Sequence, residues 1–273
     1  MTRNASRRTT AAKGGFELST LPVGPVPVSL GTAELERRDT GVLLRLDGTE
    51  SSFIDLADPT HLDFEYQQQM EAAIGTFFAA GTPVRAVHLG GAACALARAW
   101  NASRPGSTQL AVELDELLAS KVRQWFDLPR SPALRIRVGD AAAVAPTLRP
   151  GEWDVVVRDV FAQAVVPETV RTLEFTQACA RALAPGGLYL ANMSSLPRPR
   201  AAAELQVVRE TFKVHALVAD NAVARGKRRG NMVVVAANAP WTPQQREELE
   251  RSMRRLPLPA RTWELTDPAL PQL

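Results

Sequence analysis

Three carboxylates and one run of small residues stand where short apolar segments of the sequence end. Glu113, Asp140 and Asp159 follow three such segments, and Gly90-Gly91-Ala92 follows a fourth. Small residues let a loop approach a ligand closely, and the helix after it presents free N–H groups. One carboxylate can accept two hydrogen bonds from a ribose diol, and another can receive an adenine amino group. Together these residues predict a pocket for a nucleoside.

Each of these features also has a structural explanation when it is taken alone. Two glycines after a strand often form only a turn, and an acid at a strand end often caps the next helix. The order of the features along the chain favours the pocket, because Glu113 follows the small-residue loop by about twenty residues, as in dinucleotide-binding folds.

The residues need a parallel sheet to bring them to one edge. Five short apolar segments alternate with helical stretches, and nearly continuous apolar runs are typical of strands covered on both faces. The predicted strands are Val84–Leu89, Gln109–Glu113, Ala133–Val138, Trp153–Asp159 and Leu188–Met193. This pattern predicts a doubly wound α/β layer.

The last two strands break the alternation. Phe212–Ala219 and Met232–Ala237 are separated only by Asn221–Asn231, which is too short for a crossover helix. We therefore expect them to form an antiparallel hairpin. A mostly parallel, seven-stranded sheet that ends in such a hairpin is typical of the Rossmann-like fold that binds S-adenosylmethionine.

The flanking segments divide the chain further. Residues 16–60 are turn-rich, and Asp47-Gly48 between apolar runs predicts a small antiparallel β unit of three or four strands. The predicted Rossmann-like domain covers residues 61–239 and begins with a helix that ends near Gly81. Residues 240–273 predict one helix followed by a Pro-rich tail.

Composition excludes several classes of protein. The 273 residues are 45% hydrophobic and 22% charged, as in soluble globular proteins, and no stretch of 18 consecutive apolar residues is present. Two cysteines, Cys94 and Cys179, give no disulfide framework and predict buried thiols in a reducing, cytoplasmic location. The three histidines are far apart in sequence, so we expect no metal site.

Positive charge is concentrated in two places. Residues 1–15 carry four basic residues and no acid, and the turn Arg225–Arg229 carries four more basic residues. Both segments could contact nucleic acid. Since no aromatic residue is interleaved for base stacking, we favour a disordered tail and an exposed turn, and we expect no nucleic-acid partner. The sequence leaves a homodimer open.

Several of these segments resemble the polyamine aminopropyltransferase family, the spermidine synthases. The resemblance rests on Gly90–Arg98, Val112–Asp115, Gly139–Ala141 and Trp153–Phe175, while the run DPTHLDFEY at 58–66 resembles the actinobacterial branch. It implies a pocket for decarboxylated S-adenosylmethionine or its product methylthioadenosine.

The resemblance also implies a role for individual residues. Glu113 would hold the ribose, Asp140 and Ala141 would meet the adenine, and Asp159 would be the catalytic acid at the reacting centre. The residues implied at the nucleoside are Gly90, Gly91, Ala92, Glu113, Leu114, Asp140, Ala141 and Asp159.

The motifs for the amine acceptor depart from the family pattern. The family carries Gly-Gly-Gly-Asp-Gly, Tyr-His-Glu and Asp-x-x-Asp, but this chain has Ala93 for the loop Asp, Tyr66-Gln67-Gln68, and Ala162 for the second Asp. One carboxylate about 4 Å from an ammonium is worth roughly 4 kcal/mol at an effective dielectric constant of about 20. The loss of two or three acids predicts that a cationic polyamine is a poor acceptor.

The sequence therefore predicts a transferase that uses S-adenosylmethionine or its decarboxylated form on a non-standard acceptor. Two alternatives remain open at this point. One is a non-catalytic protein that binds a nucleoside or a partner, and the other is an S-adenosylmethionine-dependent methyltransferase that acts on nucleic acid. Arg158, beside Asp159, is expected to reach solvent rather than substrate.

Overall fold

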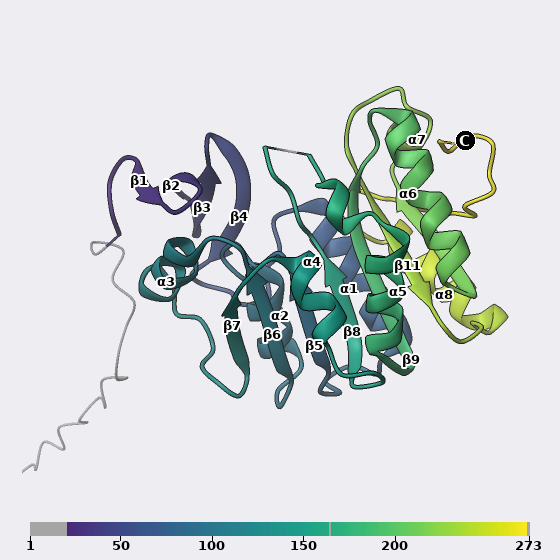
Figure 1. The fold of residues 1–273 in the computed structure, drawn as a ribbon, viewed down its shortest axis with the longest axis horizontal. Helices are drawn as coiled ribbons and strands as arrows, with labels where there is room; N and C mark the ends of the chain where they lie inside the picture. The colour runs from purple at the N-terminus through teal and green to yellow at the C-terminus, as the bar shows by residue number, and fades with distance from the viewer. Residues whose placement is uncertain (1–20, 164, 272–273) are drawn as a thin grey trace, which may run out of the picture.

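A computed structural model describes residues 21–163 and 165–271 of the chain. Its N-terminal part is a small antiparallel sheet (Figure 1). Its strands pair in the order β1-β2-β3-β4, and the β unit predicted from the sequence is therefore confirmed. The strands are β1 (Val26–Val28), β2 (Gly31–Arg38), β3 (Gly41–Leu46) and β4 (Thr49–Asp55). The basic tail predicted for residues 1–15 lies outside the described residues.

The central sheet has the order β12-β10-β11-β9-β8-β5-β6-β7. The five strands from β9 to β7 are parallel, and β11 pairs antiparallel with both β9 and β10. The predicted parallel layer and its terminal hairpin are thus confirmed. The strands are β5 (Arg85–Leu89), β6 (Thr108–Glu113), β7 (Leu134–Val138), β8 (Trp153–Arg158), β9 (Leu183–Ser194), β10 (Val214–Ala219), β11 (Asn231–Ala237) and β12 (Arg261–Trp263).

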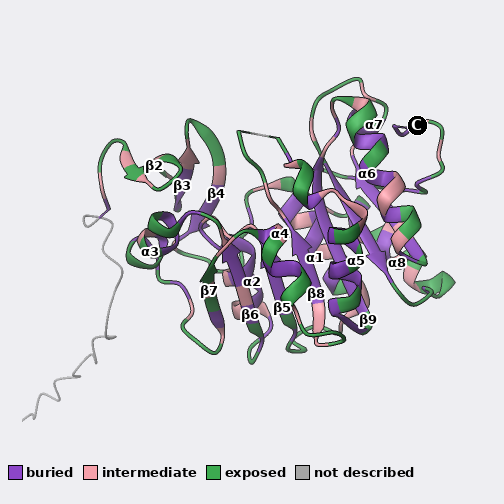
Figure 2. Cartoon of the chain, viewed as in Figure 1, coloured by how far each residue is buried: buried purple, intermediate pink, exposed green. Residues whose placement is uncertain are grey.

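Helices cover both faces of this sheet. Buried side chains of α1, α2 and α8 pack on one face, and those of α4, α5 and α6 pack on the other. Figure 2 shows the strands between them as mostly buried. The helices are α1 (Glu65–Phe77), α2 (Ala95–Ser103), α3 (Glu116–Trp125), α4 (Ala141–Val144), α5 (Leu173–Ala182), α6 (Arg198–Thr211), α7 (Asn221–Ala224) and α8 (Pro243–Arg254), with short 3-10 turns at Ala145–Thr147 and Glu168–Val170.

The described part of the sheet has eight strands rather than the predicted seven. The additional strand, β12, lies in the segment expected to be only a Pro-rich tail, and it pairs antiparallel with β10. Trp263 is buried, and its indole N–H donates to the carbonyl of Ala219 at 3.3 Å. Three residues are too short for a periodic signal, so long-range packing of this side chain forms the strand.

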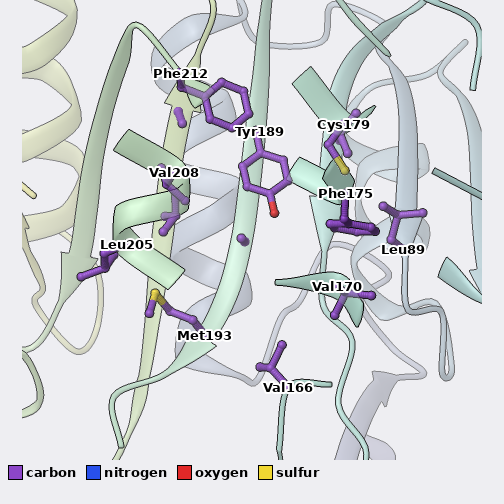
Figure 3. Close-up of a cluster of buried hydrophobic side chains, with 14 of the residues drawn as sticks. Leu89, Val166, Val170, Phe175, Cys179, Tyr189, Met193, Leu205, Val208 and Phe212 are labelled. Carbon is purple, nitrogen blue, oxygen red and sulfur yellow. The ribbon is translucent and has the colours of Figure 1, made fainter. Parts of the chain in front are cut away.

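The larger core cluster lies beneath α5 and α6. Figure 3 shows Tyr189 of β9 beside Phe212, which follows α6, and the two rings stack with centroids 5.1 Å apart. Phe175 and Cys179 of α5 complete this side of the core. The packing fixes the carboxyl end of β9, where Asn192 and Ser194 lie.

Asp115 joins the N-terminal sheet to the central one. Its carboxylate caps α3 by accepting from the Leu118 amide at 2.8 Å, and it also accepts from the amides of Ser29 at 2.9 Å and Leu30 at 2.6 Å. Burial alone would raise the pKa of Asp115, but these three amides outweigh it and hold the pKa below its ordinary value. The turn between β1 and β2 is therefore held against the start of α3.

We expect Asp115→Ala to destabilise the fold by about 2–4 kcal/mol, because it removes a helix cap and two further hydrogen bonds to a charged group. The carboxylate contributes fully above its unfolded pKa of about 3.9, and the contribution is lost as the pH falls through the lower folded pKa. Urea unfolding at pH 7 and below pH 4 measures both effects. Asp127→Ala, at an exposed acid after the same helix, is the control; equal losses in both variants would contradict the role of Asp115.

Candidate functional site

A cavity of about 960 Å³ opens at the carboxyl edge of the central sheet. The loops after β5, β6, β7 and β8 form its floor, and turns of the N-terminal sheet form one wall. The residues predicted at the nucleoside all line it: Gly90, Gly91, Ala92, Glu113, Leu114, Asp140, Ala141 and Asp159. The topology thus brings the whole predicted group to one place.

The loop after β5 fits closely against the loop after β8. Gly90 has a φ of +94°, and a Cβ at this position would overlap the carbonyl of Asp159. The Asp159 amide in turn donates to the carbonyl of Leu89 at 2.8 Å. Only glycine fits at position 90, because φ is positive there and because the Asp159 backbone leaves no room for a Cβ. These close backbone contacts help to position Asp159.

Glu113 lies beneath this loop. One carboxylate oxygen accepts from the amides of Ala92 at 2.8 Å and Gly91 at 3.3 Å, and the other accepts from the Asp115 amide at 3.0 Å. Each carboxylate oxygen has two acceptor positions, and the second oxygen therefore keeps one position for a ligand. The carboxylate both shapes the loop and faces the cavity that the loop encloses.

Asp140 is at the start of α4 and is exposed. Its Oδ1 accepts from the Ala142 amide at 2.8 Å and caps the helix. Acids at strand ends often have this capping role. Its other oxygen makes no hydrogen bond within the described residues, so capping leaves that oxygen available to a donor in the cavity.

Asp159 lies at the centre of the cavity edge and is held by two donors. The Tyr66 hydroxyl donates to Oδ2 at 2.7 Å, and Nδ2 of Asn192 donates to Oδ1 at 2.9 Å. Burial raises the pKa of Asp159 even though both hydrogen bonds lower it. Burial and the neighbouring Asp159 raise the pKa of Tyr66 well above its ordinary value, so the phenol keeps its proton. Asp159 is thus a half-buried carboxylate that takes up a proton more readily than a fully exposed one.

The predicted acceptor residues are only partly brought together. Tyr66, Gln67 and Ala162 line the cavity, and Nε2 of Gln67 donates to the Tyr66 hydroxyl at 3.3 Å. Gln68 does not line it, because its side chain turns to the carbonyl of Leu62 at 2.7 Å. Residues three apart share a helix face, and Gln69 therefore stands on the cavity side where Gln68 was expected.

The cavity is not depleted of acids to the extent that the motif losses suggested. Ala93 is buried and does not line it, but acids near the start of α1 do. The carboxylates that line the cavity in the described part of the chain are Asp47, Glu50, Asp63, Glu65, Glu113, Asp115, Asp140, Asp159 and Asp220. Glu50 is paired with Arg38 and Arg45, whereas Asp63 and Glu65 are exposed beside Tyr66.

Arg158 does not reach solvent as the sequence suggested. Its side chain is 1% exposed and forms an ion pair with Glu204 of α6 beneath the sheet. Nη2 also donates to the carbonyl of Asn192 at 2.8 Å. The alternation of a strand places Arg158 and Asp159 on opposite sides, and the partner on α6 explains why the guanidinium is buried.

Two groups of site residues were missed from the sequence. Asn192 stands inside an apolar strand, where a polar residue near the carboxyl end was the only available signal. The turns of the N-terminal sheet, including Leu30 and Asp47, line the cavity through tertiary packing that no local pattern predicts.

Other reactive chemistry is restricted. Burial raises the pKa of the Cys94 thiol to about 12, so a thiolate nucleophile is disfavoured. No group of three His, Cys, Asp or Glu side chains within residues 21–163 and 165–271 could hold a metal ion. Among the helices in this same part of the chain, none has the length and apolar character needed to cross a membrane.

Comparison with known proteins finds spermidine synthases among the chains of similar sequence and fold. No family model matches the sequence. The crystal structure of a probable spermidine synthase from Corynebacterium glutamicum is 35% identical with a TM-score of 0.82, and the match covers 90% of this chain and 91% of that one. A spermidine synthase in complex with the transition-state analogue AdoDATO is 16% identical with a TM-score of 0.62, over 85% of this chain and 78% of that one, and it confirms the fold.

A curated relative gives a shorter match. The polyamine aminopropyltransferase of Chromobacterium violaceum is 26% identical over 145 residues, which is 53% of this chain and 54% of the relative. This chain therefore matches about half the length of that curated relative.

Proposed function

The chain belongs to the spermidine synthase family, and we propose on that basis that it is a transferase for S-adenosylmethionine or decarboxylated S-adenosylmethionine with an acceptor other than a standard polyamine. The observation that carries the proposal is the convergence of Gly90, Glu113, Asp140 and Asp159 on one cavity. The cavity volume of about 960 Å³ is at the upper end of the range of small-molecule sites.

The nucleoside half of the cavity suits an adenosyl group. Glu113 retains an acceptor position for a ribose hydroxyl, and the oxygen of Asp140 that does not cap α4 can accept from an adenine amino group. Leu114 is 57% exposed at the cavity and offers an apolar surface for the base. The structure of a related fold with AdoDATO supports a ligand of this class.

The residues around Asp159 suit the transfer itself. The acceptor amine nitrogen would attack the carbon next to the sulfonium, the carbon–sulfur bond would break, and sulfur would leave as a neutral thioether. The amine enters as an ammonium with a pKa near 10, so a base must remove one proton before the attack. Asp159 is a half-buried carboxylate within this half of the cavity, and its raised pKa brings it closer to that of an efficient general base.

The transferred group depends on the co-substrate rather than on the mechanism. The same displacement gives aminopropyl transfer from decarboxylated S-adenosylmethionine and methyl transfer from S-adenosylmethionine. None of the residues named in the nucleoside pocket distinguishes S-adenosylmethionine from its decarboxylated form. The proposal therefore includes both methyl transfer and aminopropyl transfer.

Calorimetric titration with S-adenosylmethionine, its decarboxylated form and methylthioadenosine tests this proposal. We expect at least one to bind, and we expect Glu113→Gln to weaken it by about 10- to 100-fold, because a hydrogen bond to a charged group contributes roughly 1.5–3 kcal/mol. Glu116→Gln, an exposed acid three residues later, should leave binding unchanged. Failure of all three to bind wild-type protein would contradict the proposal and favour an interaction protein without catalysis.

A further inference from the structure

The end of the cavity farthest from the nucleoside residues carries two arginines. Arg228 and Arg229 belong to the connection between β10 and β11, and both line the cavity together with Ser194 and Asn231. Ser194 and Asn231 are paired residues at the adjoining ends of β9 and β11. The basic turn that the sequence suggested was simply exposed therefore forms one wall of the site.

The strand order fixes the direction from the nucleoside to these arginines. Along the carboxyl edge, the residues at the nucleoside follow β7, β6 and β5, Asp159 follows β8, and the arginines precede β11. Only β9 separates β8 from β11, and neighbouring strands lie about 4.8 Å apart. The start of β11 is thus displaced sideways from the end of β8 by roughly 10 Å, on the side away from the nucleoside. Asn231 pairs with Ser194, three residues beyond the Ala191 that pairs with Arg158, so the start of β11 also lies roughly 10 Å farther out along the strand direction.

Charges of both signs line this part of the cavity. Asp63 and Glu65 line it near Tyr66 in sequence, and Asp159 contacts both the Tyr66 hydroxyl and the loop after β5. On the far wall Arg228 is 3.5 Å from Asp220 and 57% exposed. Arg229 has no ion-pair or hydrogen-bond partner within the described residues, so its guanidinium is available to a ligand.

We propose that the acceptor is an ω-amino acid, whose amine lies at Asp159 and whose carboxylate is bound by Arg229 and Arg228. This inference rests on the transferase function proposed above. A planar guanidinium matches a carboxylate through two parallel hydrogen bonds. A diamine of the same length would instead bring its second ammonium towards Arg229, whose charge no carboxylate of the described residues pairs with, and like charges repel. Arg228 contributes less to this repulsion because Asp220 pairs with it.

The test compares ligands of one length on wild-type protein. Calorimetry with 5-aminopentanoate, 1,5-diaminopentane and pentylamine, each with and without methylthioadenosine, is expected to show the tightest binding for the amino acid. The double variant Arg228→Gln/Arg229→Gln should weaken the amino acid by about tenfold or more and leave pentylamine unchanged. Arg225→Gln is the matched control, because Arg225 is in the same connection but does not line the cavity.

Each contrary outcome has a distinct meaning. Tighter binding of the diamine than of the amino acid by wild-type protein would overturn the proposal, and so would a double variant that binds the amino acid as well as wild type. Weaker binding of S-adenosylmethionine but not of methylthioadenosine by the double variant would reassign the arginines to the carboxylate of the co-substrate. Tighter binding of a 4-carbon aminoalkyl phosphonate would reassign them to phosphate-like groups.

The same titrations separate this inference from the function on which it rests. If S-adenosylmethionine, its decarboxylated form and methylthioadenosine all fail to bind while 5-aminopentanoate still depends on the arginines, the transferase proposal fails and the carboxylate site stands. If methylthioadenosine binds and the amino acid shows no such dependence, the transferase proposal stands and the carboxylate site fails.

Discussion

Asp159→Asn is expected to lower turnover by about 10²- to 10⁴-fold, the usual contribution of a general base, while the protein folds normally. The acceptor ammonium must lose a proton before it can attack, and a neutral amide cannot accept it. The variant retains the hydrogen bonds of the site, because the new amide oxygen can accept from Tyr66. Its NH₂ group can face Asn192, whose Oδ1 is buried without a partner and can rotate to accept.

The stability of this variant should change in the opposite direction to its activity. Burial raises the pKa of Asp159 in the folded protein above the unfolded value of about 3.9. The folded state therefore binds the proton more tightly than the unfolded state, and wild-type stability falls as the pH rises through the window between the two pKa values. The Asn variant has no such cost, so it should be at least as stable as wild type at pH 7, with a difference that shrinks in acid.

Turnover measured against pH, together with thermal unfolding at pH 4 and pH 7, checks both expectations. Wild-type turnover should decline as the pH falls through the raised pKa of Asp159, where the base becomes protonated. Asp127→Asn, at an exposed acid, is the control for loss of one negative charge. Unchanged turnover in Asp159→Asn would remove this residue from the mechanism.

The fold and the convergence of Glu113, Asp140 and Asp159 on one cavity could be predicted because their signals are local. Valine-rich runs such as Val155–Val157 indicate strands covered on both faces, and parallel strands necessarily bring the residues that follow them to one edge. Glu113, Asp140 and Asp159 needed no further information to converge. The order of the strands then follows from short, right-handed connections.

What the sequence did not predict depends on contacts between distant residues. Arg158 is buried because Glu204, 46 positions later, meets it beneath the sheet, and β12 forms because Trp263 packs against β10. Asp63 and Glu65 add acids to the cavity at positions of the chain other than those of the acids missing from the family motifs. A motif comparison records a lost residue at its own position but not a charge supplied from elsewhere.

The Arg158–Glu204 pair supports the Asp159 carboxylate through Asn192. Arg158 donates to the carbonyl of Asn192, and the Asn192 side chain donates to Asp159. Burial alone would lower the pKa of Arg158, but the Glu204 carboxylate outweighs it and raises the pKa. The guanidinium therefore stays charged inside the protein, and it depends on Glu204 for its neutralising charge.

Glu204→Gln is expected to destabilise the fold by about 3–5 kcal/mol, because it leaves a buried guanidinium without a counter-charge. Urea unfolding measures the loss, and Glu210→Gln, an exposed acid on the same helix, should cost less than about 0.5 kcal/mol.

The double variant Arg158→Met/Glu204→Leu should recover most of the stability, since apolar residues often replace a buried ion pair without loss. It should still turn over more slowly than wild type, because Asn192 has lost the guanidinium that fixes it. A double variant as unstable as Glu204→Gln would show instead that the site needs the shape of these two side chains and not the balance of their charges.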